Sequence, residues 1–505
     1  MDTHIRKVVI AGGGTAGWMT AAALTKLLGK QLEITLVESD EIATIGVGEA
    51  TIPTLQDFHQ FLQINEAEFI KATNGTFKLG ISFENWRNTD ENYIHAFGTT
   101  GQQSWAAGFQ HFWLKAKQQG IAGDYGDYCL EQVAAKQEKF SHLPGQGMSQ
   151  GTNKGINYAY HIDATLYGKF LRTMAEHHGI SRVEGKIEQV NIDHNSGDIT
   201  SLTLKSGQVI GGDLFIDCTG QRALLIEKAL HTGYIDWSHW LPCDSAIAVQ
   251  TKAIKDPIPY TRSIAHEFGW QWQIPLQNRV GNGIVYSSRF VSDEKALATL
   301  TSNIEGETIT EPLHIKYRTG TRRKHWNKNC IAIGLSSGFL EPLESTSIHL
   351  IQQAIIRLVR LFPYHGIKES DVNEFNKQTQ FDTERIRDFI VLHYKVTNRN
   401  DANFWQHCRN MSIPDTLSHK IQLFKETGRM FRENNELFND SWMQVMIGQG
   451  IVPESYHPMV DNMSDKELAD FFAHLENKIS SIVAKLPKHN DYVQKYCASN
   501  LYANQ

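Results

Sequence analysis

Residues 6–40 read RKVVIAGGGTAGWMTAAALTKLLGKQLEITLVESD and decide the fold of the first part of the chain. The apolar run Lys7–Ala11 predicts a short buried strand, and the Ala- and Leu-rich segment from about Ala16 to Leu28 predicts a helix. Glu33–Val37 predicts a second strand. A strand, a helix and a second strand in this order are the βαβ unit of a dinucleotide-binding fold.

The turn between the first strand and the helix carries three glycines with the spacing G-x-G-x-x-G, at Gly12, Gly14 and Gly17. Glycines permit the tight turn and let a pyrophosphate approach the helix N-terminus. Glu38, about twenty residues after the last glycine, would accept hydrogen bonds from ribose hydroxyls, which favours FAD or NAD over NADP. The glycine spacing alone fits a plain turn equally well. The strand, helix, strand and acid in order favour dinucleotide binding.

Two later segments indicate FAD as the dinucleotide. The alternating short runs of residues 181–213, with turns at NSGD and KSGQ, predict a β-meander. They lead into GGDLFIDCTG (211–220), a strand that ends in the Thr-Gly turn typical of FAD proteins with this fold. The sequence contains no second complete G-x-G-x-x-G for a nicotinamide cofactor. This suggests that the flavin arrives already reduced.

The composition is that of an ordinary globular protein. Apolar residues make up 41% and charged residues 21% of the 505 residues, and the net charge of −6 favours neither nucleic acid nor an anionic membrane as a partner. The six cysteines form no C-x-x-C pair, so we expect neither a disulfide framework nor a metal site. No signal peptide and no apolar run of bilayer length are present, so we expect a soluble, cytoplasmic protein.

Strand-like runs continue to about residue 345, and amphipathic segments of helical periodicity follow from Ile348. The sequence therefore predicts an α/β protein. It would have a Rossmann-like, monooxygenase-type FAD-binding fold with a mixed sheet and a β-meander, and a largely helical C-terminal part that binds substrate. We expect the core at residues 1–347, with substrate-side insertions at about 76–160, and the helical part at residues 348–505.

Seven separated motifs resemble those of the flavin-dependent halogenases, the group often called tryptophan halogenases, and occur in the same order. They are GGGTAGW (12–18), GVGEATIP (46–53), TFKLG (76–80), HAF (95–97), YAYHIDATLYGKFL (158–171), WQWQIP (270–275) and GFLEPLESTS (338–347). The W-x-W-x-I-P element discriminates best, because flavin hydroxylases of similar fold lack it.

The resemblance implies a reaction in which reduced FAD, O2 and chloride or bromide yield hypohalous acid, which passes through a tunnel to a separate substrate pocket. Lys78 would hydrogen-bond the hypohalous acid or carry the halogen as a haloamine, and partial burial would lower its pKa toward the neutral form. Glu344 would orient the oxidant and stabilise or deprotonate the cationic ring intermediate. Phe77 and Leu79 are expected to form walls that keep water from the oxidant.

The same resemblance implies the other site residues. Those expected to bind FAD are Gly12, Gly13, Gly14, Thr15, Ala16, Gly17, Glu38, Ser39, Ile42, Ile45, Val47, Ala50, Leu335 and Ile348. The backbone amides of Thr346 and Ser347, at a helix N-terminus, would bind the halide. His95 and Phe97 would sandwich the substrate ring. The tunnel and structural residues are Trp270, Trp272, Pro275, Phe339, Pro342 and Ser345.

Several of these residues also have a plainer interpretation. Lys78 alone fits a surface lysine with a buried apolar stem, and only the surrounding motifs favour a catalytic role. Trp270 and Trp272 alternate on one strand face and fit core packing, which is compatible with a tunnel role. The LESTS segment fits ordinary helix capping, and the same amides would serve capping and halide binding.

The sequence departs from the family pattern in two places. Ser347 stands where glycine is common, which would alter either the affinity for the halide or the preference between chloride and bromide. We expect bromide to be used more readily than chloride. The Tyr, Glu and Phe-Trp cluster that clamps the tryptophan backbone is not found, and residues 439–461 read NDSWMQVMIGQGIVPESYHPMVD instead. Trp442 and Tyr456 would line the pocket or pack in the core. The expected substrate is an electron-rich aromatic: indole, a compound that contains indole, or tryptophan itself.

Two other functional classes compete with this hypothesis. An FAD-dependent aromatic monooxygenase would hydroxylate its substrate without needing halide. A flavin-binding sensor would have no use for both Lys78 and Glu344. The halogenase hypothesis requires a separate NADH-dependent flavin reductase as partner, and we expect a monomer or homodimer that binds no nucleic acid.

Overall fold

The computed structural model describes residues 4–41, 49–102, 104, 107–143, 155–433, 436–438 and 440–499. The chain forms two compact units, each built from three segments. The first unit comprises Met1–Thr73, Ile162–Ser238 and Tyr317–Glu384, and the second comprises Asn74–His161, His239–Lys316 and Arg385–Gln505. The expected boundary between a core at residues 1–347 and a substrate-binding helical part at residues 348–505 stays a prediction.

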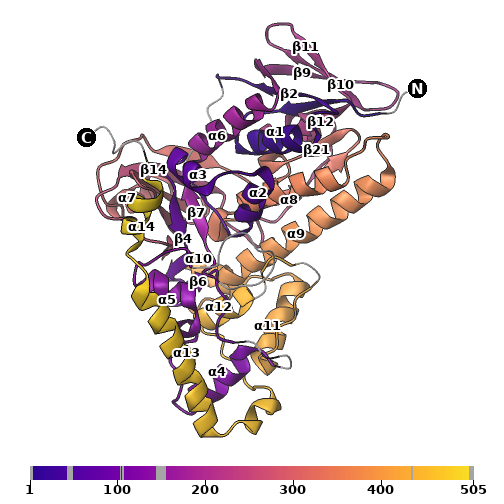
Figure 1. The fold of residues 1–505 in the computed structure, drawn as a ribbon. Helices are drawn as coiled ribbons and strands as arrows, with labels where there is room; N and C mark the ends of the chain where they lie inside the picture. The colour runs from indigo at the N-terminus through magenta and orange to yellow at the C-terminus, as the bar shows by residue number, and fades with distance from the viewer. Residues whose placement is uncertain are drawn as a thin grey trace. The chain divides into compact units, whose positions relative to one another are not determined.

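The first unit is built on a six-stranded sheet with strand order β20-β21-β12-β1-β2-β8. Figure 1 labels β2, β12 and β21 of this sheet. Strand β1 is central and parallel to β2 and β12, while β20 runs antiparallel to β21, so the sheet is mixed as predicted. The strands are β1 Lys7–Ala11, β2 Glu33–Glu38, β8 Ser181–Glu184, β12 Leu214–Asp217, β20 Trp326–Asn327 and β21 Cys330–Ala332.

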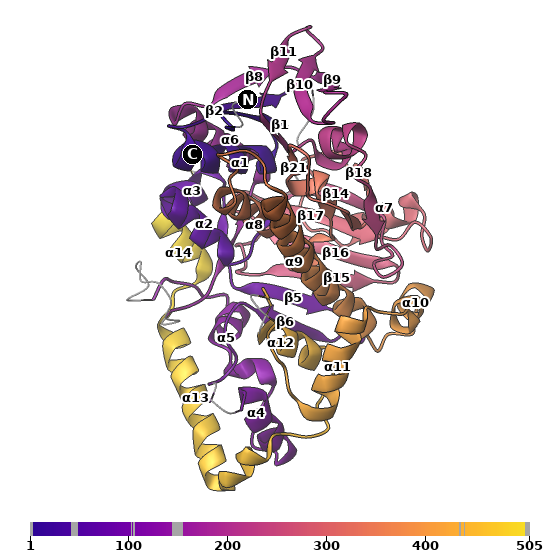
Figure 2. The same cartoon turned by 90° about the vertical axis from the view of Figure 1, so that its right-hand side faces the viewer.

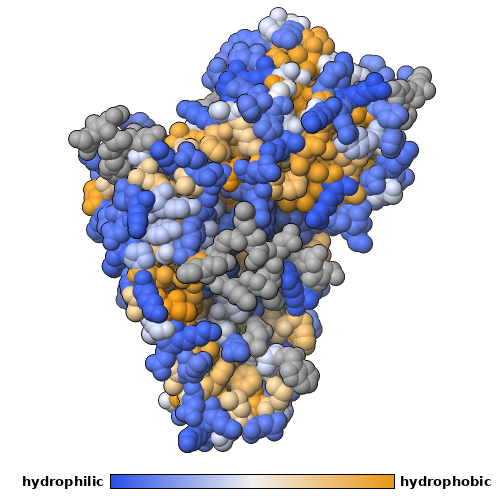
Figure 3. Space-filling view, in the orientation of Figure 1, coloured by the Kyte–Doolittle hydropathy of each residue, from blue (hydrophilic) through white to orange (hydrophobic). Residues whose placement is uncertain are grey.

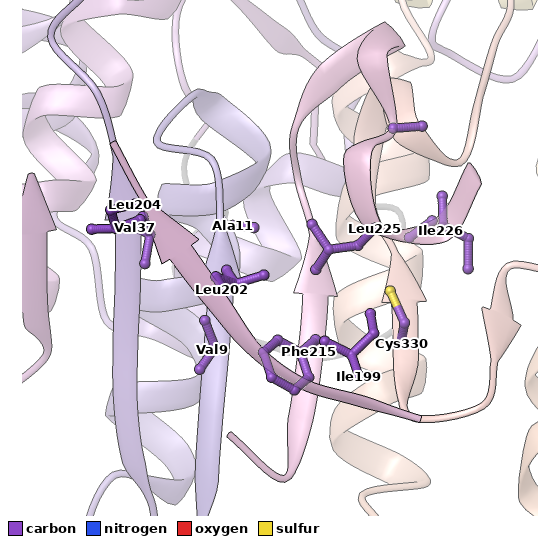
Figure 4. Packing of buried hydrophobic residues seen from close by; sticks show 12 residues of the cluster. Val9, Ala11, Val37, Ile199, Leu202, Leu204, Phe215, Leu225, Ile226 and Cys330 are labelled. Carbon is purple, nitrogen blue, oxygen red and sulfur yellow. The ribbon is translucent and has the colours of Figure 1, made fainter. Parts of the chain in front are cut away.

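A β-meander packs against this sheet, as the alternating runs predict. Its strands are β9 Ile187–Ile192, β10 Ile199–Leu204 and β11 Val209–Gly211, in the order β11-β10-β9. Figure 4 shows how its apolar residues pack with those of the six-stranded sheet. Leu202 of the meander and Phe215 of β12 are both fully buried in this core, which therefore joins the two sheets.

Helices and shorter strands complete the first unit. The helices are α1 Thr15–Leu28, α2 Thr54–Leu62, α3 Glu66–Ala72, α6 Ala164–His177 and α8 Ser347–Arg360. The short strands are β3 Glu49–Ala50, β13 Tyr234–Asp236, β19 Gly320–Arg322 and β22 Gly338–Phe339. The α9 helix, Glu369–Lys395, contributes residues 369–384 to this unit and the remainder to the second.

The second unit is built on a seven-stranded sheet with strand order β18-β14-β17-β16-β15-β5-β6, and Figure 2 shows β14 to β6 one after another in this order. Most neighbours are antiparallel, and β15 is parallel to β5. The strands are β5 Gly80–Glu84, β6 Asn92–Ala96, β14 Ser245–Lys252, β15 Thr261–His266, β16 Gly269–Pro275, β17 Arg279–Tyr286 and β18 Leu313–Lys316. A separate antiparallel pair joins β4, Thr76–Lys78, to β7, Ala159–Ile162.

The two faces of the seven-stranded sheet carry different residues, because side chains alternate along a strand. Ile284 and its neighbours on one face pack with α7, Asp293–Ser302. The other face carries Trp270 and Trp272 of β16, and the register places Ser263 of β15 beside Trp272. The other helices of this unit are α4 Phe109–Gln118, α5 Leu130–Lys136, α10 Asn403–Asn410, α11 Asp415–Thr427, α12 Asp440–Gly448, α13 Asp465–Lys485 and α14 His489–Cys497.

The surface is mixed in character, with hydrophilic residues between hydrophobic patches on the face drawn in Figure 3. Within the described residues, no helix is both long enough and apolar enough to cross a membrane. All six cysteines are reduced and buried.

Candidate active site

The glycine loop after β1 leaves no room for side chains at three of its positions. Gly12 has a φ of +110°, and a Cβ there would lie 2.3 Å from the carbonyl oxygen of Cys218. A Cβ on Gly13 would lie 1.6 Å from Glu38 Oε2, and one on Gly17 would lie 1.9 Å from the Gly12 carbonyl oxygen. The protein itself therefore requires these three glycines.

Gly14 differs from the other glycines in the loop. A Cβ there would meet no atom of the described residues within 4 Å, so the loop is open on this side. Gly14 is also the N-cap of α1, which receives no side-chain cap from the described residues. Uncapped amides beside open space at a helix N-terminus suit a phosphate group. The residues present therefore fit the pyrophosphate of FAD.

Glu38 lies at the end of β2 and above Gly13, as a ribose-binding acid should. Its Oε2 accepts a hydrogen bond from Trp18 Nε1 at 3.3 Å, and its Oε1 accepts one from Arg182 Nε at 2.5 Å. A carboxylate has about four acceptor positions, so Glu38 keeps the capacity to accept from ribose hydroxyls. Arg182, which lies on the neighbouring strand β8, has no motif to mark it in the sequence.

The other residues expected to contact FAD lie in separate parts of the first unit. Gly334, next to Leu335, has a φ of +77°, and its position lies against Ala16 of α1. Ile348 is buried in the first turn of α8, which contacts α1, and Ala50 is buried in β3. Ser39 directly follows β2. Ile42, Ile45 and Val47 lie outside the described residues.

Glu344 is held in a tight turn before α8. A 3-10 turn spans Pro342–Glu344, and Ser345 follows it with a φ of +58°. Glu344 is 1% exposed, and Glu341 is also fully buried. Phe339, upstream of the turn, packs its ring 4.4 Å from that of Tyr317. The turn thus withdraws the Glu344 carboxylate from solvent and fixes its backbone.

Thr346 and Ser347 form the N-terminus of α8. Thr346 is the N-cap of the helix and makes no side-chain cap hydrogen bond to the described residues. The helix is fixed by a hydrogen bond of 2.8 Å between Thr54 Oγ1 and His349 Nδ1. Backbone amides at such an end carry partial positive charge, so this arrangement suits a halide ion.

Lys78, in the second unit, is fully buried on strand β4. The strand pairs with β7, so that Lys78 lies opposite Ala159. Its Nζ lies 5.1 Å from the centroid of the Phe97 ring, within range of a cation–π interaction. The interpretation of Lys78 as a surface lysine is therefore wrong.

A neutral histidine lies beside the lysine. Thr76 shares the strand face of Lys78, and its hydroxyl donates to the Pro275 carbonyl oxygen at 2.8 Å. Its Oγ1 can therefore accept from His161 Nδ1 at 3.0 Å, while His161 Nε2 lies 3.0 Å from Thr261 Oγ1. Burial and the nearby Lys78 charge hold the pKa of His161 well below its usual value. This neutral imidazole adds no positive charge beside the amine.

Phe77 faces away from Lys78, which corrects the expectation that its ring walls the amine. Side chains alternate along a strand, and the Phe77 ring is stacked on Phe140 at 4.2 Å on the opposite face. Tyr158 and Tyr492 also contact it, with ring centroids 5.5 and 5.8 Å away. Phe77 thus anchors the strand, and Phe97 is the ring beside the lysine amine.

His95 and Phe97 begin a chain of aromatic contacts. Their ring centroids lie 6.5 Å apart, and His95 lies edge-on to Phe389 of α9 at 5.6 Å. Phe389 is stacked on Phe438 at 3.9 Å and contacts Trp442 at 4.9 Å. We call these five residues the aromatic wall. Trp442 thus packs beside the predicted substrate residues. No local sequence pattern marked Phe389 or Phe438 as members of this wall.

Polar contacts fix this wall. Trp442 Nε1 donates to Glu436 Oε1 at 2.8 Å, and Lys420 Nζ forms a buried ion pair with Glu436 Oε2 at 2.8 Å. The side chain of Gln444 accepts from the Ala96 amide and donates to the Gly98 carbonyl oxygen, both at 2.9 Å. The wall is therefore held at its Trp442 end and at the backbone beside Phe97.

The W-x-W-x-I-P strand lies in the same unit. Trp270 and Trp272 are buried, with ring centroids 6.2 Å apart. The Trp272 indole lies over Gly283, where a Cβ would be 2.0 Å from Cζ2. Pro275 is buried at the end of the strand, and its carbonyl oxygen bonds to Thr76 on the Lys78 strand. The motif therefore has a direct contact to β4 as well as a packing role.

The predicted residues fall into two groups. The first unit holds the glycine loop, Glu38 and the Glu344 turn with the start of α8. The second unit holds Lys78, the aromatic wall and the W-x-W-x-I-P strand. The first group can bind a dinucleotide and an anion. The second offers a buried amine beside aromatic rings.

Comparisons with known proteins identify the family of the chain. The tryptophan halogenase family model matches residues 7–465. Tryptophan 6-halogenase SttH from Streptomyces toxytricini is 34% identical, over 96% of this chain and 97% of that protein. Tryptophan 7-halogenase RebH from Lentzea aerocolonigenes is 33% identical, over 98% and 99%.

Solved structures show the same relationship. Xcc4156, a flavin-dependent halogenase from Xanthomonas campestris, has a TM-score of 0.95 at 53% identity, covering 98% of this chain and 99% of that one. BrvH, a flavin-dependent halogenase from Brevundimonas sp. BAL3, has a TM-score of 0.93 at 43% identity, covering 98% and 100%. The chain therefore belongs to the tryptophan halogenase family of flavin-dependent halogenases.

Proposed function

We propose that this flavin-dependent halogenase transfers halogen from hypohalous acid to an electron-rich aromatic ring, by way of Lys78. The observation that carries the proposal is the fully buried Lys78 amine, 5.1 Å from the Phe97 ring. A buried amine can hold an electrophilic halogen away from water. The comparisons support halogenation over direct hydroxylation.

The residues of the first unit would hold the flavin and the halide. The glycine loop and α1 N-terminus would bind the pyrophosphate, and Glu38 the ribose. The amides of Thr346 and Ser347 would bind the halide. Reduced FAD, when bound, would supply two electrons to O2, and the halide would supply the other two as it is oxidised, so that hypohalous acid and water are formed. A separate NADH-dependent reductase would deliver that flavin.

Lys78 and Glu344 would divide the work on the substrate. Lys78 would bind the hypohalous acid or carry the halogen as a haloamine. The buried Glu344 carboxylate would orient the oxidant, then stabilise the positive ring and accept its proton, because a negative group favours developing positive charge. The proton passes to the carboxylate as the halogenated ring regains its aromaticity.

Indole or a compound that contains indole is the proposed substrate. Phe97 is the partly exposed ring beside Lys78 and would contact a flat, electron-rich ring, while the buried rings of the aromatic wall pack behind it. The tryptophan clamp of the family is not found in residues 439–461, which supports a substrate other than free tryptophan.

Three finer points complete the proposal. Bromide is used more readily than chloride, because it is more easily oxidised. The protein works in the cytoplasm as a monomer or homodimer. Product ratios with equimolar bromide and chloride test the first point, and light scattering tests the oligomeric state.

The decisive experiment is mass spectrometry of an aromatic panel incubated with the protein, FAD, a flavin reductase, NADH and bromide or chloride. Indole and indole-containing compounds should gain one halogen in place of hydrogen. A product that carries oxygen instead, and forms equally without halide, would refute the proposal.

A further inference from the structure

The outer edge of the Lys78 strand is closed by a side chain from the C-terminal helix. Alternate N–H groups of a strand point to opposite edges, and β7 occupies one edge of β4. On the other edge, the Phe77 amide donates to His489 Nε2 at 3.2 Å. The Leu79 amide, on the same edge, donates to the Pro259 carbonyl oxygen at 2.7 Å.

The His489 ring is locked in one orientation. Its Nε2 accepts from Phe77, so its Nδ1 carries the proton and donates to the Pro257 carbonyl oxygen at 2.7 Å. His489 is 1% exposed. A buried ring whose two nitrogens both form hydrogen bonds has little freedom to move. It therefore fixes the position of the Phe77 backbone amide.

A second residue joins the start of the strand to the end of α14. The Gln277 backbone amide donates to the Asn74 carbonyl oxygen at 3.0 Å, and its Nε2 donates to that of Gly75 at 2.8 Å. The same Nε2 lies 3.2 Å from the Cys497 carbonyl oxygen, and Oε1 accepts from the Ser499 amide at 2.8 Å. Gln277 is 4% exposed. One buried amide therefore ties β4 to the chain segment that follows α14.

Gln277 directly extends the W-x-W-x-I-P element. It lies two residues after Pro275, whose carbonyl oxygen accepts the Thr76 hydroxyl. The Lys78 strand is thus held by hydrogen bonds at consecutive residues. Gln277 bonds to Gly75, Pro275 bonds to Thr76, and His489 bonds to Phe77. We call Pro275, Gln277 and His489 the Lys78 support.

We propose that Gln277 and His489 are positioning residues for the Lys78 amine, so that α14 and the end of the W-x-W-x-I-P strand set the place where the halogen is delivered. This inference rests on the proposed function. A shift of about 1 Å at a reacting group can lower a rate by about 100-fold. Hypohalous acid is neutral and diffusible, so a displaced amine would let it escape before it meets the substrate.

The test measures where the oxidant goes. Wild type and variants are supplied with FAD, reductase, NADH, bromide and indole, and escaped hypohalous acid is trapped with monochlorodimedone. We expect His489→Ala and Gln277→Leu to raise the ratio of trapped halogen to haloindole by about tenfold. Flavin oxidation and FAD affinity should stay at the wild-type level, since both substitutions lie outside the glycine loop.

Two further variants separate positioning from a general loss of structure. His489→Gln keeps an acceptor for Phe77 and a donor for Pro257, so it should restore much of the coupling. His474→Ala, at an exposed histidine of α13, should match wild type. If His489→Ala fails to fold, Gln277→Leu and His489→Gln are compared by the same ratio.

The possible failures are distinguishable. A wild-type ratio in folded His489→Ala and Gln277→Leu would overturn the inference, while haloindole from wild type would still uphold the proposed function. A wild-type enzyme that forms no haloindole and consumes no halide would refute the proposed function itself, and the inference with it.

Discussion

The glycine loop of the first unit and the Lys78 strand of the second are both fixed tightly, but by different means. In the loop, Gly13 lies against Glu38 and Gly17 against Gly12, all within one short segment of the chain. The Lys78 strand depends on Pro275 and His489, which are 199 and 412 residues from their partners. A local sequence pattern reveals the first kind of site, while the second needs the folded chain.

The largest expected effect comes from removing the Lys78 amine of the second unit. Lys78→Ala should lower halogenation by roughly 10³-fold or more, because no other group would hold the halogen. FAD binding and flavin oxidation should persist. Haloindole per oxidised NADH measures the loss.

A matched control is Lys115→Ala, which removes another buried lysine of the same unit, whose Nζ binds the Met463 carbonyl oxygen at 3.0 Å. It should lower stability but keep halogen transfer. Substantial halogenation by Lys78→Ala would remove the lysine from the mechanism.

The next effect tests the proposed role of Glu344 in the turn before α8. Glu344→Gln keeps the shape but removes the negative charge, so ring halogenation should slow by about 10²-fold. Glu341→Gln, three residues earlier and equally buried, is the control and should retain most of the activity. Single-turnover assays with reduced FAD measure both. Equal rates in wild type and Glu344→Gln would contradict the assignment.

Two alanine substitutions distinguish neighbouring glycines of the loop. Gly13→Ala places a Cβ against Glu38, so the FAD-free protein should lose about 1–3 kcal/mol of unfolding free energy. Gly14→Ala meets only open space, so stability should not change. FAD affinity should nevertheless fall by about tenfold, because the methyl group enters the proposed pyrophosphate site.

Thermal denaturation without FAD and titration with FAD measure these two quantities separately. Unchanged FAD affinity in Gly14→Ala would place the pyrophosphate elsewhere.

The last comparison concerns one buried histidine from each unit. Burial lowers the pKa of His349 and of His489 to about 4, from 6.5. Between pH 6.5 and 4 these two imidazoles are protonated in the unfolded chain but stay neutral in the folded chain. The unfolding free energy therefore falls as the pH falls. Each histidine contributes roughly 1.4 kcal/mol per pH unit in this window.

Urea unfolding at several pH values measures the slope, and His349→Gln or His489→Gln should each make it shallower. A slope unchanged in both variants would show that these histidines take up protons while folded.

The sequence predicted the first unit well because its signals are short in range. β1 spans Lys7–Ala11 as expected, α1 begins at Thr15, close to the expected Ala16, and the β-meander forms as the alternating runs indicate. Glu38 also lies above the glycine loop. Each of these features depends on residues near it in the chain.

The second unit was harder to predict. Lys78 and Trp272 could be named from motifs, but the strand face of Phe77 was misjudged, although alternation alone places it opposite Lys78. Gln277 and His489 carry no motif, because a single amide or imidazole becomes meaningful only once the chain brings its partners together. The aromatic wall likewise combines residues from β6, α9 and α12 with Phe97 and Phe438.

The burial of all six thiols has a consequence for the lifetime of the enzyme. A protein that makes hypohalous acid meets that oxidant at a higher concentration than its neighbours do. Thiols are oxidised according to their exposure and thiolate character, and burial raises the pKa of the Cys330 thiol well above its ordinary value. The fold thus shields its own most oxidisable groups from its product, which favours many turnovers before inactivation.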